Sequence, residues 1–469
     1  MRLGIDLGTG SLKAMAVEAD GSVRLASAAY PVEARERGAA ETEPELWLSA
    51  LDEALASLGG AGEAECVGFS GQMHGVVPIS LREGALAPAI LWADQRSKEM
   101  VEAFRAAAAP FGGRLVNAPA AGMAALTLMW LKRRRPDLYD RTEVFLFPKD
   151  YLRWRLTGEV ATDRSDASGG LLYDLAADRW DRELIEALGL DAGKLPPVRG
   201  SAETAGRVGP EAAARSGLPE GVAVATGAAD TAAALYGSAL TADRGVQISV
   251  GTGVQIARLL SRIPPYSPSL NVFAAAEDGL CFRMAAMLNG GIALEWARGL
   301  LGLGWEEAYA AFESRRIAPE GELMFLPYLA GERTPYMNPE ARGAWLGLSL
   351  RHGPLDLLHA ALLGVACTIR LGLETLGAAE GEELRFVGGS ARYPYWTRLV
   401  SSVLARPLRL FDLSDLSARG AVALGAVAAG KGGRPEESPR RVFVEPERLD
   451  WIEEYYDRFK GAYLRLFSP

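Results

Sequence analysis

The sequence predicts a soluble α/β protein of two or three domains, from its length, its composition and a strand-turn-strand pattern that occurs twice. The chain has 469 residues, which is longer than a single hydrophobic core usually becomes. Hydrophobic residues make up 49% of it, the ordinary share for a globular protein, so disorder is not expected. The formal net charge of −9 argues against a broad nucleic-acid-binding surface but allows a local basic pocket.

The cysteines and the N-terminus indicate a cytoplasmic protein. Cys66, Cys281 and Cys367 are far apart and odd in number, which argues against a disulfide framework and favours a reducing compartment. No apolar run reaches the roughly 18 residues of a membrane span. Asp6 lies where a signal peptide would need an apolar region. We therefore expect neither a membrane nor a nucleic acid as partner.

The repeated pattern is a short strand, a Gly-Thr-Gly turn and a second strand. It occurs at residues 3–7, 8–10 and 12–17, and again at residues 246–250, 251–253 and 254–260. An Asp20-Gly21 pair predicts a further hairpin after the first copy. The two turns are either a coincidence or the mark of a duplicated fold with two similar domains facing a cleft. The polar connection at residues 236–245 is the expected hinge.

Two helix signals lie in the N-terminal half. Residues 42–45 (Thr-Glu-Pro-Glu) resemble a capping box before an amphipathic helix that contains Trp47 and Leu58. The basic run at residues 132–135, followed by Pro136, is typical of a helix C-terminus. The alternative for that run, a nucleic-acid-binding patch, is disfavoured by the acidic total.

Three glycine-rich turns are candidate phosphate sites, because no lysine stands in the frame of a Walker A loop. Glycine lets backbone N–H groups approach an anion closely, and consecutive N–H groups form an anion-binding concavity. The turns are Gly8-Thr9-Gly10, Gly251-Thr252-Gly253 and Gly388-Gly389-Ser390. The third precedes a helical run, so it also offers a helix N-terminus.

Two aspartates lie beside small-residue turns. Asp6 is in an apolar strand before the first turn, where it can accept backbone N–H groups or hold a hydrated Mg²⁺ near phosphates. Asp230 follows Gly227-Ala228-Ala229 and is a candidate helix N-cap. The helix dipole would keep this carboxylate ionised, so that it could also accept a proton from a substrate hydroxyl. The two roles of Asp230 are compatible.

Polar side chains also follow two strand-like runs, where open α/β sheets bind ligands. Gln72 and His74 come after one run, and Asp94 and Arg96 come after the other. Together they offer the mixed donors and acceptors that a polyol requires, and Trp92 offers an apolar face. A lone histidine is nevertheless more often structural than functional.

These motifs, taken in order, resemble the FGGY carbohydrate kinases of the actin–hexokinase superfamily, and among them the xylulokinases. The resemblance covers nearly the whole chain and is highly specific in combination. The matching segments are residues 4–9, 71–75, 148–152, 227–232, 325–329, 331–335 and 388–392.

The resemblance implies two ribonuclease-H-like (actin/hexokinase-type) domains around a central cleft, which we place at residues 1–240 and 241–469. It implies phosphorylation of a sugar by ATP with Mg²⁺, and we expect a ketopentose, D-xylulose, to be phosphorylated at its terminal hydroxyl. The alternatives are a kinase for ribulose, gluconate, glycerol or a sugar alcohol, and a non-catalytic sensor on the same fold. A homodimer is compatible with the sequence.

On the matching positions, the resemblance implies that Asp230 is the general base and that Asp6 lies near the metal, held directly or through water. We expect the sugar to contact Gln72, Met73, His74, Trp92, Asp94, Arg96 and Asp230. We expect the nucleotide to contact Gly8, Thr9, Gly10, Lys13, Gly251, Thr252, Gly253, Gly388, Gly389 and Ser390. The chain departs from the family pattern at Thr127, Thr231 and Leu363, which weakens the inference to one particular sugar.

Overall fold

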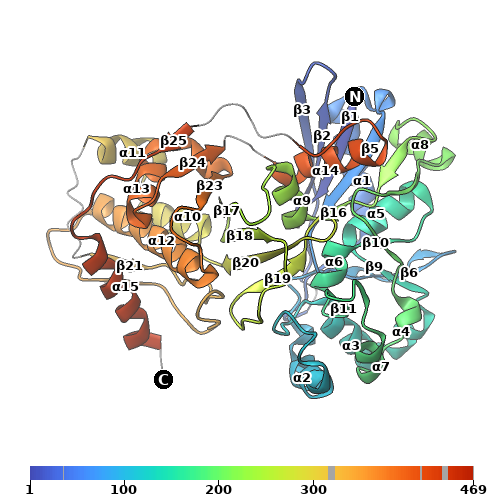
Figure 1. The fold of residues 1–469 in the computed structure, drawn as a ribbon, viewed down its shortest axis with the longest axis horizontal. Coiled ribbons are helices and arrows are strands. Elements are labelled where there is room, and N and C mark those ends of the chain that lie inside the picture. Colours follow the sequence, from blue (N-terminus) through green and yellow to red (C-terminus); the bar gives the residue numbers. More distant parts are fainter. Residues whose placement is uncertain (35, 315–322, 412–414, 436–441, 468–469) are drawn as a thin grey trace.

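The computed structural model describes residues 1–469 except 35, 315–322, 412–414, 436–441 and 468–469. The described chain forms two halves, each built around a seven-stranded mixed sheet (Figure 1). The first sheet contains β1 (Arg2–Leu7), β2 (Ser11–Val17), β3 (Val23–Ala29), β5 (Cys66–Gly71), β14 (Thr204–Arg207), β15 (Ala223–Ala225) and β16 (Ala228–Ala229). The second contains β17 (Gly245–Val250), β18 (Val254–Leu260), β19 (Asn271–Ala274), β20 (Cys281–Met287), β23 (Glu383–Val387), β24 (Leu408–Phe411) and β25 (Val442–Val444).

The two sheets share one strand order. In the first, the antiparallel strands β3-β2-β1 are followed by the parallel strands β5 and β15 and by the antiparallel edge strand β14. In the second, β20-β18-β17 are followed in the same way by β23, β24 and β25, and β19 is added beside β20. The predicted duplication is therefore confirmed, and coincidental turns are ruled out.

The registers of the two hairpins explain why the Gly-Thr-Gly turns correspond. Leu7 lies opposite Leu12 in the first hairpin, and Val250 lies opposite Val254 in the second. Each pair closes a short turn that contains the Gly-Thr-Gly residues, as the sequence predicts. In both sheets, a parallel strand lies directly beside the first strand of the hairpin.

Helices cover both sheets, and short strands form small additional sheets in both halves. The helices are α1 (Pro44–Leu58), α2 (Val101–Ala108), α3 (Ala124–Arg134), α4 (Pro136–Arg141), α5 (Pro148–Thr157), α6 (Arg164–Gly169), α7 (Arg182–Ala187), α8 (Pro210–Ser216), α9 (Asp230–Gly237), α10 (Gly291–Leu300), α11 (Trp305–Glu313), α12 (Pro354–Leu376), α13 (Pro394–Leu404), α14 (Leu416–Ala428) and α15 (Ile452–Phe467). The short strands are β4 (Glu41–Thr42), β6 (Val77–Ser80), β7 (Gly84–Ala85), β8 (Ala89–Ile90), β9 (Val144–Leu146), β10 (Thr162–Asp163), β11 (Tyr173–Asp174), β12 (Arg179–Trp180), β13 (Val198–Arg199), β21 (Met324–Leu326) and β22 (Ala344–Leu346).

Both helices predicted in the N-terminal half are present, but the capping box is not. Helix α1 begins at Pro44, whose fixed φ and missing N–H suit the first helical position. The N-cap is consequently Glu43 rather than Thr42, and its side chain makes no capping hydrogen bond. Helix α3 ends at Arg134 and Pro136 begins α4, as the basic run and the proline predict.

Helix α12 is the one helix in the described parts of the chain with the length and hydropathy of a membrane span. The protein buries 78% of its most apolar 18-residue window. The helix packs against α13, β20 and β21, so its apolar side chains form part of the core of the second half.

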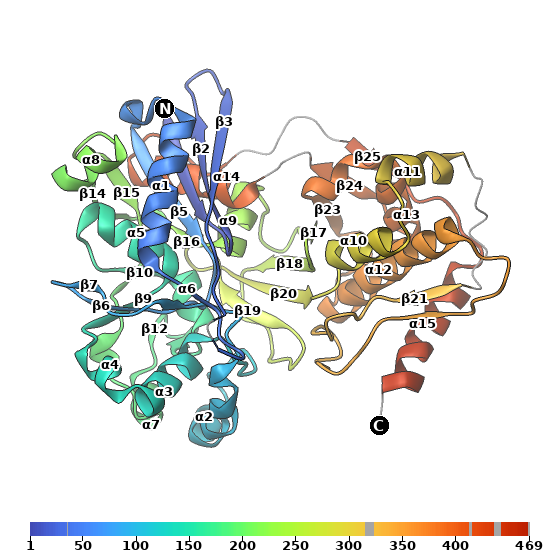
Figure 2. The same cartoon turned by 180° about the vertical axis from the view of Figure 1, so that it is seen from behind.

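Helix α14 lies between β24 and β25 of the second sheet in the chain but packs on the first sheet. It lies against β1 and β5 and crosses α9, while α1 covers the opposite face of the same sheet (Figures 1 and 2). The backbones touch because the contacting residues are small. A Cβ atom on Gly420 would lie 1.9 Å from the carbonyl oxygen of Ala233, and one on Gly68 would lie 1.8 Å from that of Ala421. Glycine is therefore required at these contacts.

We expect Gly420→Ala to destabilise the protein, because the added methyl group meets backbone atoms that cannot rotate away. Overpacking of this kind costs typically about 1–3 kcal/mol. Gly461→Ala, in the interior of α15 with no described atom closer than 4.0 Å to the new Cβ, is the matched control. It should gain up to about 1 kcal/mol from helix propensity. Thermal unfolding measures both variants, and a Gly420→Ala variant at least as stable as the wild type would contradict the close crossing.

Candidate active site

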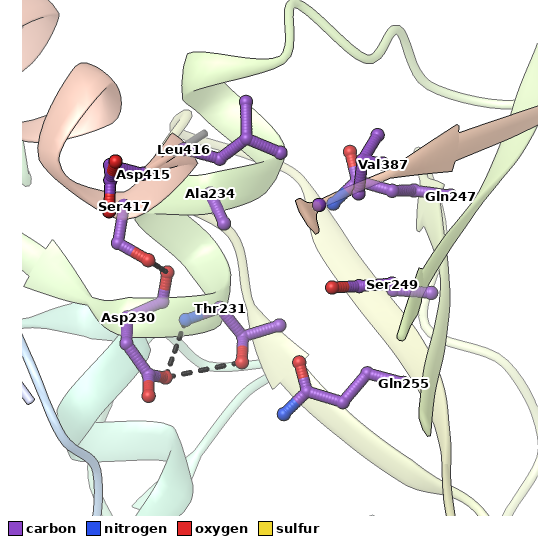
Figure 3. A pocket seen from close by; sticks show the side chains of 12 residues that line it. Asp230, Thr231, Ala234, Gln247, Ser249, Gln255, Val387, Asp415, Leu416 and Ser417 are labelled. Atoms are coloured by element: carbon purple, nitrogen blue, oxygen red, sulfur yellow. Dashed lines mark hydrogen bonds between the residues drawn. The ribbon is translucent and has the colours of Figure 1, made fainter. Parts of the chain in front are cut away.

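Two adjoining cavities lie between the halves, and Asp230, Thr231 and Gln255 line both of them. The first cavity has a volume of about 250 Å³ and includes Thr9, Gln72, Met73, His74, Trp92, Met123, Asn271, Phe273, Met284, Arg333 and Met337. The second has a volume of about 190 Å³ and includes Ala234, Gln247, Ser249, Val387, Gly388, Asp415, Leu416 and Ser417 (Figure 3). The carboxylate of Asp230 thus stands where the two cavities meet.

Asp230 is the first residue of α9, and Ala229 is its N-cap, so the prediction that Asp230 is the N-cap was wrong by one position. One carboxylate oxygen, Oδ1, accepts hydrogen bonds from the backbone N–H (2.5 Å) and the hydroxyl (3.1 Å) of Thr231 (Figure 3). Oδ2 accepts none from the described residues. Burial raises the pKa of Asp230, and the two bonds from Thr231 oppose this shift. A carboxylate with a raised pKa and one unbonded oxygen is suited to accept a proton.

His74 presents an acceptor to the first cavity. Its Nδ1 lies 2.9 Å from the carbonyl oxygen of Gly169, which can only accept a hydrogen bond. Burial, helped by the positive charge of Arg333, lowers the pKa of His74 to about 4, so the ring is neutral at pH 7. The ring proton is therefore on Nδ1, and Nε2 is the acceptor.

Other groups in the first cavity add polar and apolar contacts. Gln72 donates from Nε2 to the carbonyl oxygen of Gly8 at 3.3 Å, while its buried Oε1 has no partner among the described residues. The indole N–H of Trp92 donates to the hydroxyl of Thr9 at 3.0 Å, which fixes the ring at the cavity wall. The guanidinium carbon of Arg333 lies 6.0 Å from the centre of that ring.

Asp94 and Arg96 do not line either cavity. Asp94 is buried and accepts the backbone N–H of Ala40 at 3.0 Å and the side chain of Arg96. Arg96 also pairs with Glu36 and Glu41, at 2.8 and 2.6 Å. These contacts support the segment that carries Trp92, so the two residues do not face the site that the sequence analysis gave them.

Two further carboxylates, Asp6 and Asp415, lie near Asp230 at the second cavity. Asp6 accepts the hydroxyl of Ser70 at 3.0 Å, and Lys13 pairs with Asp415 at 2.6 Å. Burial, followed by the charge of Asp230, raises the pKa of Asp6 to about 6. The described residues contain no group of three or more His, Cys, Asp or Glu close enough to hold a metal by themselves. Such carboxylates fit Mg²⁺, which prefers oxygen ligands and keeps several waters.

The three glycine turns differ in what they offer a ligand. Gly388 lines the second cavity with a left-handed φ of +95°, and the hydroxyl of Ser390 nearby is buried without a partner among the described residues. In the hairpins, the N–H of Gly8 donates to Ser11 and that of Gly251 donates to Gly253, so these two N–H groups are already paired within the turns. Neither cavity includes residues 251–253.

Several cavity residues were not predicted from the sequence. They come from the second sheet and the loops around it, namely Gln247, Gln255, Asn271, Phe273, Met284 and Arg333. The alternation within β18 and β20 indicates strands but does not say which face points to the other half. Arg333 lies within residues 331–335, one of the segments that resemble the family, and this resemblance was the one sequence signal for these cavity residues.

A duplicated ribonuclease-H-like fold with a carboxylate between two interdomain cavities defines the actin/hexokinase class of phosphotransferases. The chain belongs to the FGGY family of carbohydrate kinases: the family's N-terminal domain model matches residues 1–237 and its C-terminal domain model matches residues 265–429. It is therefore a carbohydrate kinase that uses ATP.

Similar proteins include several xylulose kinases. The chain is 32% identical to the xylulose kinase of Escherichia coli strain K12 over 93% of this chain and 91% of that protein. The crystal structure of a xyloylose kinase from Brucella ovis is 32% identical, with a TM-score of 0.90 over 99% of both chains. A gluconate kinase from Lactobacillus acidophilus, 22% identical with a TM-score of 0.88 over 99% of this chain and 98% of that one, shares the fold.

We expect Asp6→Asn to stabilise the protein at neutral pH. The pKa of Asp6 in the folded state, about 6, lies above its ordinary value of 3.8, so protonation favours folding. This contribution is complete below pH 3.8 and is lost as the pH rises through 6. Above pH 7 the variant should be more stable than the wild type by at most about 3 kcal/mol, and the difference should vanish near pH 4.

Thermal unfolding across this pH range measures the difference. The matched control is Asp137→Asn, which removes an exposed carboxylate from α4. It should change the stability by less than about 1 kcal/mol at every pH. A stability difference for Asp6→Asn that does not vary with pH would contradict the raised pKa.

Proposed function

We propose that this kinase transfers the γ-phosphoryl group of ATP to the terminal hydroxyl of a ketopentose, converting D-xylulose to D-xylulose 5-phosphate. The observation that carries the proposal is the position of Asp230 at the junction of two cavities, one suited to a sugar and the other to phosphates. The choice of D-xylulose is supported by the similarity to xylulose kinases over nearly the whole chain.

In this proposal, the first cavity binds the sugar. Gln72 Oε1 and His74 Nε2 accept hydrogen bonds from sugar hydroxyls, because neither atom accepts one from the described residues. Trp92, Met73 and Phe273 contact the apolar faces of the sugar carbons. The terminal hydroxyl then lies at Oδ2 of Asp230, which takes its proton as the new O–P bond forms.

The second cavity binds the phosphates of ATP. The N-termini of α9 and α14 meet there, and helix N-termini attract anions through their dipoles and free N–H groups. The turn at Gly388-Gly389 allows close approach, and Lys13 adds a positive charge. Asp6, through water, and Asp415 would hold Mg²⁺, which when bound neutralises charge on the phosphates.

The repulsion between Asp6 and Asp230 supports this arrangement, because a cation beside them would relieve it. Holding the hydroxyl in line with the phosphoryl group can supply about 7–11 kcal/mol of the barrier, more than a general base alone. We also propose that the enzyme is cytoplasmic and binds neither membrane nor nucleic acid, and the homodimer stays a prediction.

An ADP-coupled assay with D-xylulose, D-ribulose, gluconate, glycerol and xylitol tests the substrate. We expect kcat/KM for D-xylulose to exceed that of the others by at least about tenfold, the discrimination that one or two mismatched groups provide. A higher kcat/KM for another compound reassigns the substrate within the same family. Sugar binding by calorimetry without ADP production from any of the five would support a non-catalytic sensor instead.

Asp230→Asn should fold and bind the sugar but lose turnover, because asparagine keeps the size of the side chain and cannot accept the proton. The loss in kcat should be about 10²–10⁴-fold, the range for a general base. Calorimetry measures the sugar Kd, which should stay within a few fold of the wild type. If the variant keeps wild-type kcat, Asp230 is not the base.

A further inference from the structure

A cluster of five charged side chains lies fully buried behind the turn that carries Asp230, and we call it the Lys149 cluster. Its members are Lys149, Asp150 and Arg153 of α5, Asp163 of β10 and Asp166 of α6, each with no exposed surface. Lys149 Nζ lies 2.7 Å from Asp150, 2.9 Å from Asp163 and 3.0 Å from Asp166. Arg153 pairs with Asp150 at 2.8 Å.

Burying these charges is costly, and apolar residues of the same volume often stabilise a core at least as well. Stability alone is therefore a weak reason for such a cluster. Burial also raises the pKa of Asp166 well above its ordinary value, against the pull of Lys149. The cluster thus places two cations among three carboxylates.

The Lys149 cluster supports both ends of the turn that precedes Asp230, one end directly and the other through Ser165, which is hydrogen-bonded to Asp163. At one end, Arg153 donates to the carbonyl oxygen of Thr226 at 2.9 Å. At the other end, the N–H of Ala229 donates to the hydroxyl of Ser165 at 2.8 Å. This hydrogen bond fixes the peptide between Ala228 and Ala229, one residue before Asp230, and so restrains the backbone that leads into the carboxylate.

Asp163 fixes the Ser165 hydroxyl in turn. Its Oδ2 accepts the backbone N–H of Ser165 at 2.8 Å and the hydroxyl of Ser165 at 2.5 Å. The hydroxyl proton of Ser165 is thus committed to Asp163, and its oxygen lone pair is aimed at Ala229. A second serine, Ser201, donates to the same Oδ2 at 3.0 Å.

Helix α6, which carries Ser165, also contacts two other parts of the site. The carbonyl oxygen of Gly169, its last residue, contacts Nδ1 of His74 at 2.9 Å. The hydroxyl of Ser168 accepts the N–H of Ala274 from β19 of the second sheet at 2.9 Å. One buried helix therefore contacts the residue before the base, the sugar-facing histidine and the other half of the molecule.

We propose that Asp163 and Ser165 are positioning residues for the phosphoryl transfer, and that they set the orientation of Asp230 through the N–H of Ala229. The proposal rests on the proposed function, in which Asp230 is the general base. Neither residue touches a substrate in this assignment. Their effect is on the alignment of the carboxylate with the acceptor hydroxyl, where a misplacement of 1 Å can cost about a hundredfold in rate.

The test compares Ser165→Ala with Ser201→Ala. Both remove one buried hydroxyl that donates to Asp163 Oδ2, so both should lower the thermal unfolding midpoint, and Ser165→Ala should lower it more because it also leaves the N–H of Ala229 unpaired. Only Ser165→Ala removes the acceptor for Ala229. We expect kcat of Ser165→Ala to fall about 10- to 100-fold while the KM for ATP and the sugar Kd stay within threefold, and kcat of Ser201→Ala to stay within threefold of the wild type.

Hydrogen exchange of the peptide that contains Ala229 should be faster in Ser165→Ala and unchanged in Ser201→Ala, which reports the bond directly. If Ser165→Ala does not fold, Ser165→Cys keeps the volume with a weaker acceptor, and its kcat should fall severalfold. Equal kcat values for the two alanine variants, or wild-type kcat in a folded Ser165→Cys, would overturn the proposal. A wild-type enzyme without kinase activity would instead overturn the proposed function.

Discussion

The close crossing of α9 and α14 is the constraint on which the rest of the site depends. The helices meet backbone to backbone at Gly420 and Ala233, and any larger side chain at Gly420 would separate them. Asp230 begins α9, and Ser417, in the first turn of α14, donates to the backbone carbonyl oxygen of Asp230 at 3.1 Å. The crossing therefore fixes two helix N-termini on one cavity wall, where their dipoles act together on an anion.

Charged groups in this protein fall into two kinds. Those of the Lys149 cluster are enclosed by partners of opposite sign, and they support a turn. Those at the cavities are incompletely paired, since Oδ2 of Asp230 accepts no hydrogen bond from the described residues. Complete pairing makes the support rigid, whereas an incompletely paired carboxylate can still gain interaction free energy from a ligand. The two kinds of charged group lie on opposite sides of one short turn.

The sequence predicted what local patterns determine. Alternating strands around Gly-Thr-Gly gave both hairpins and hence the duplicated fold, and the small-residue turn drew attention to Asp230. Prediction from the sequence failed for site residues whose role depends on which side chains meet in space. Asp94 and Arg96 are polar residues at a strand end, yet they pair with each other and with Glu41 rather than with a ligand. The faces of β18 and β20 are likewise chosen by packing between the halves, which no single strand encodes.

The position of α14 has a consequence for synthesis of the chain. All strands of the first sheet are complete by Ala229, but the helix that covers one face of that sheet begins at Leu416. At typical rates of translation, roughly 10–40 s separate the two events. During that interval the nascent first sheet presents an apolar face that includes Met15, with Gly4 and Gly68 leaving it flat. A truncation before α14 would leave that face without its cover.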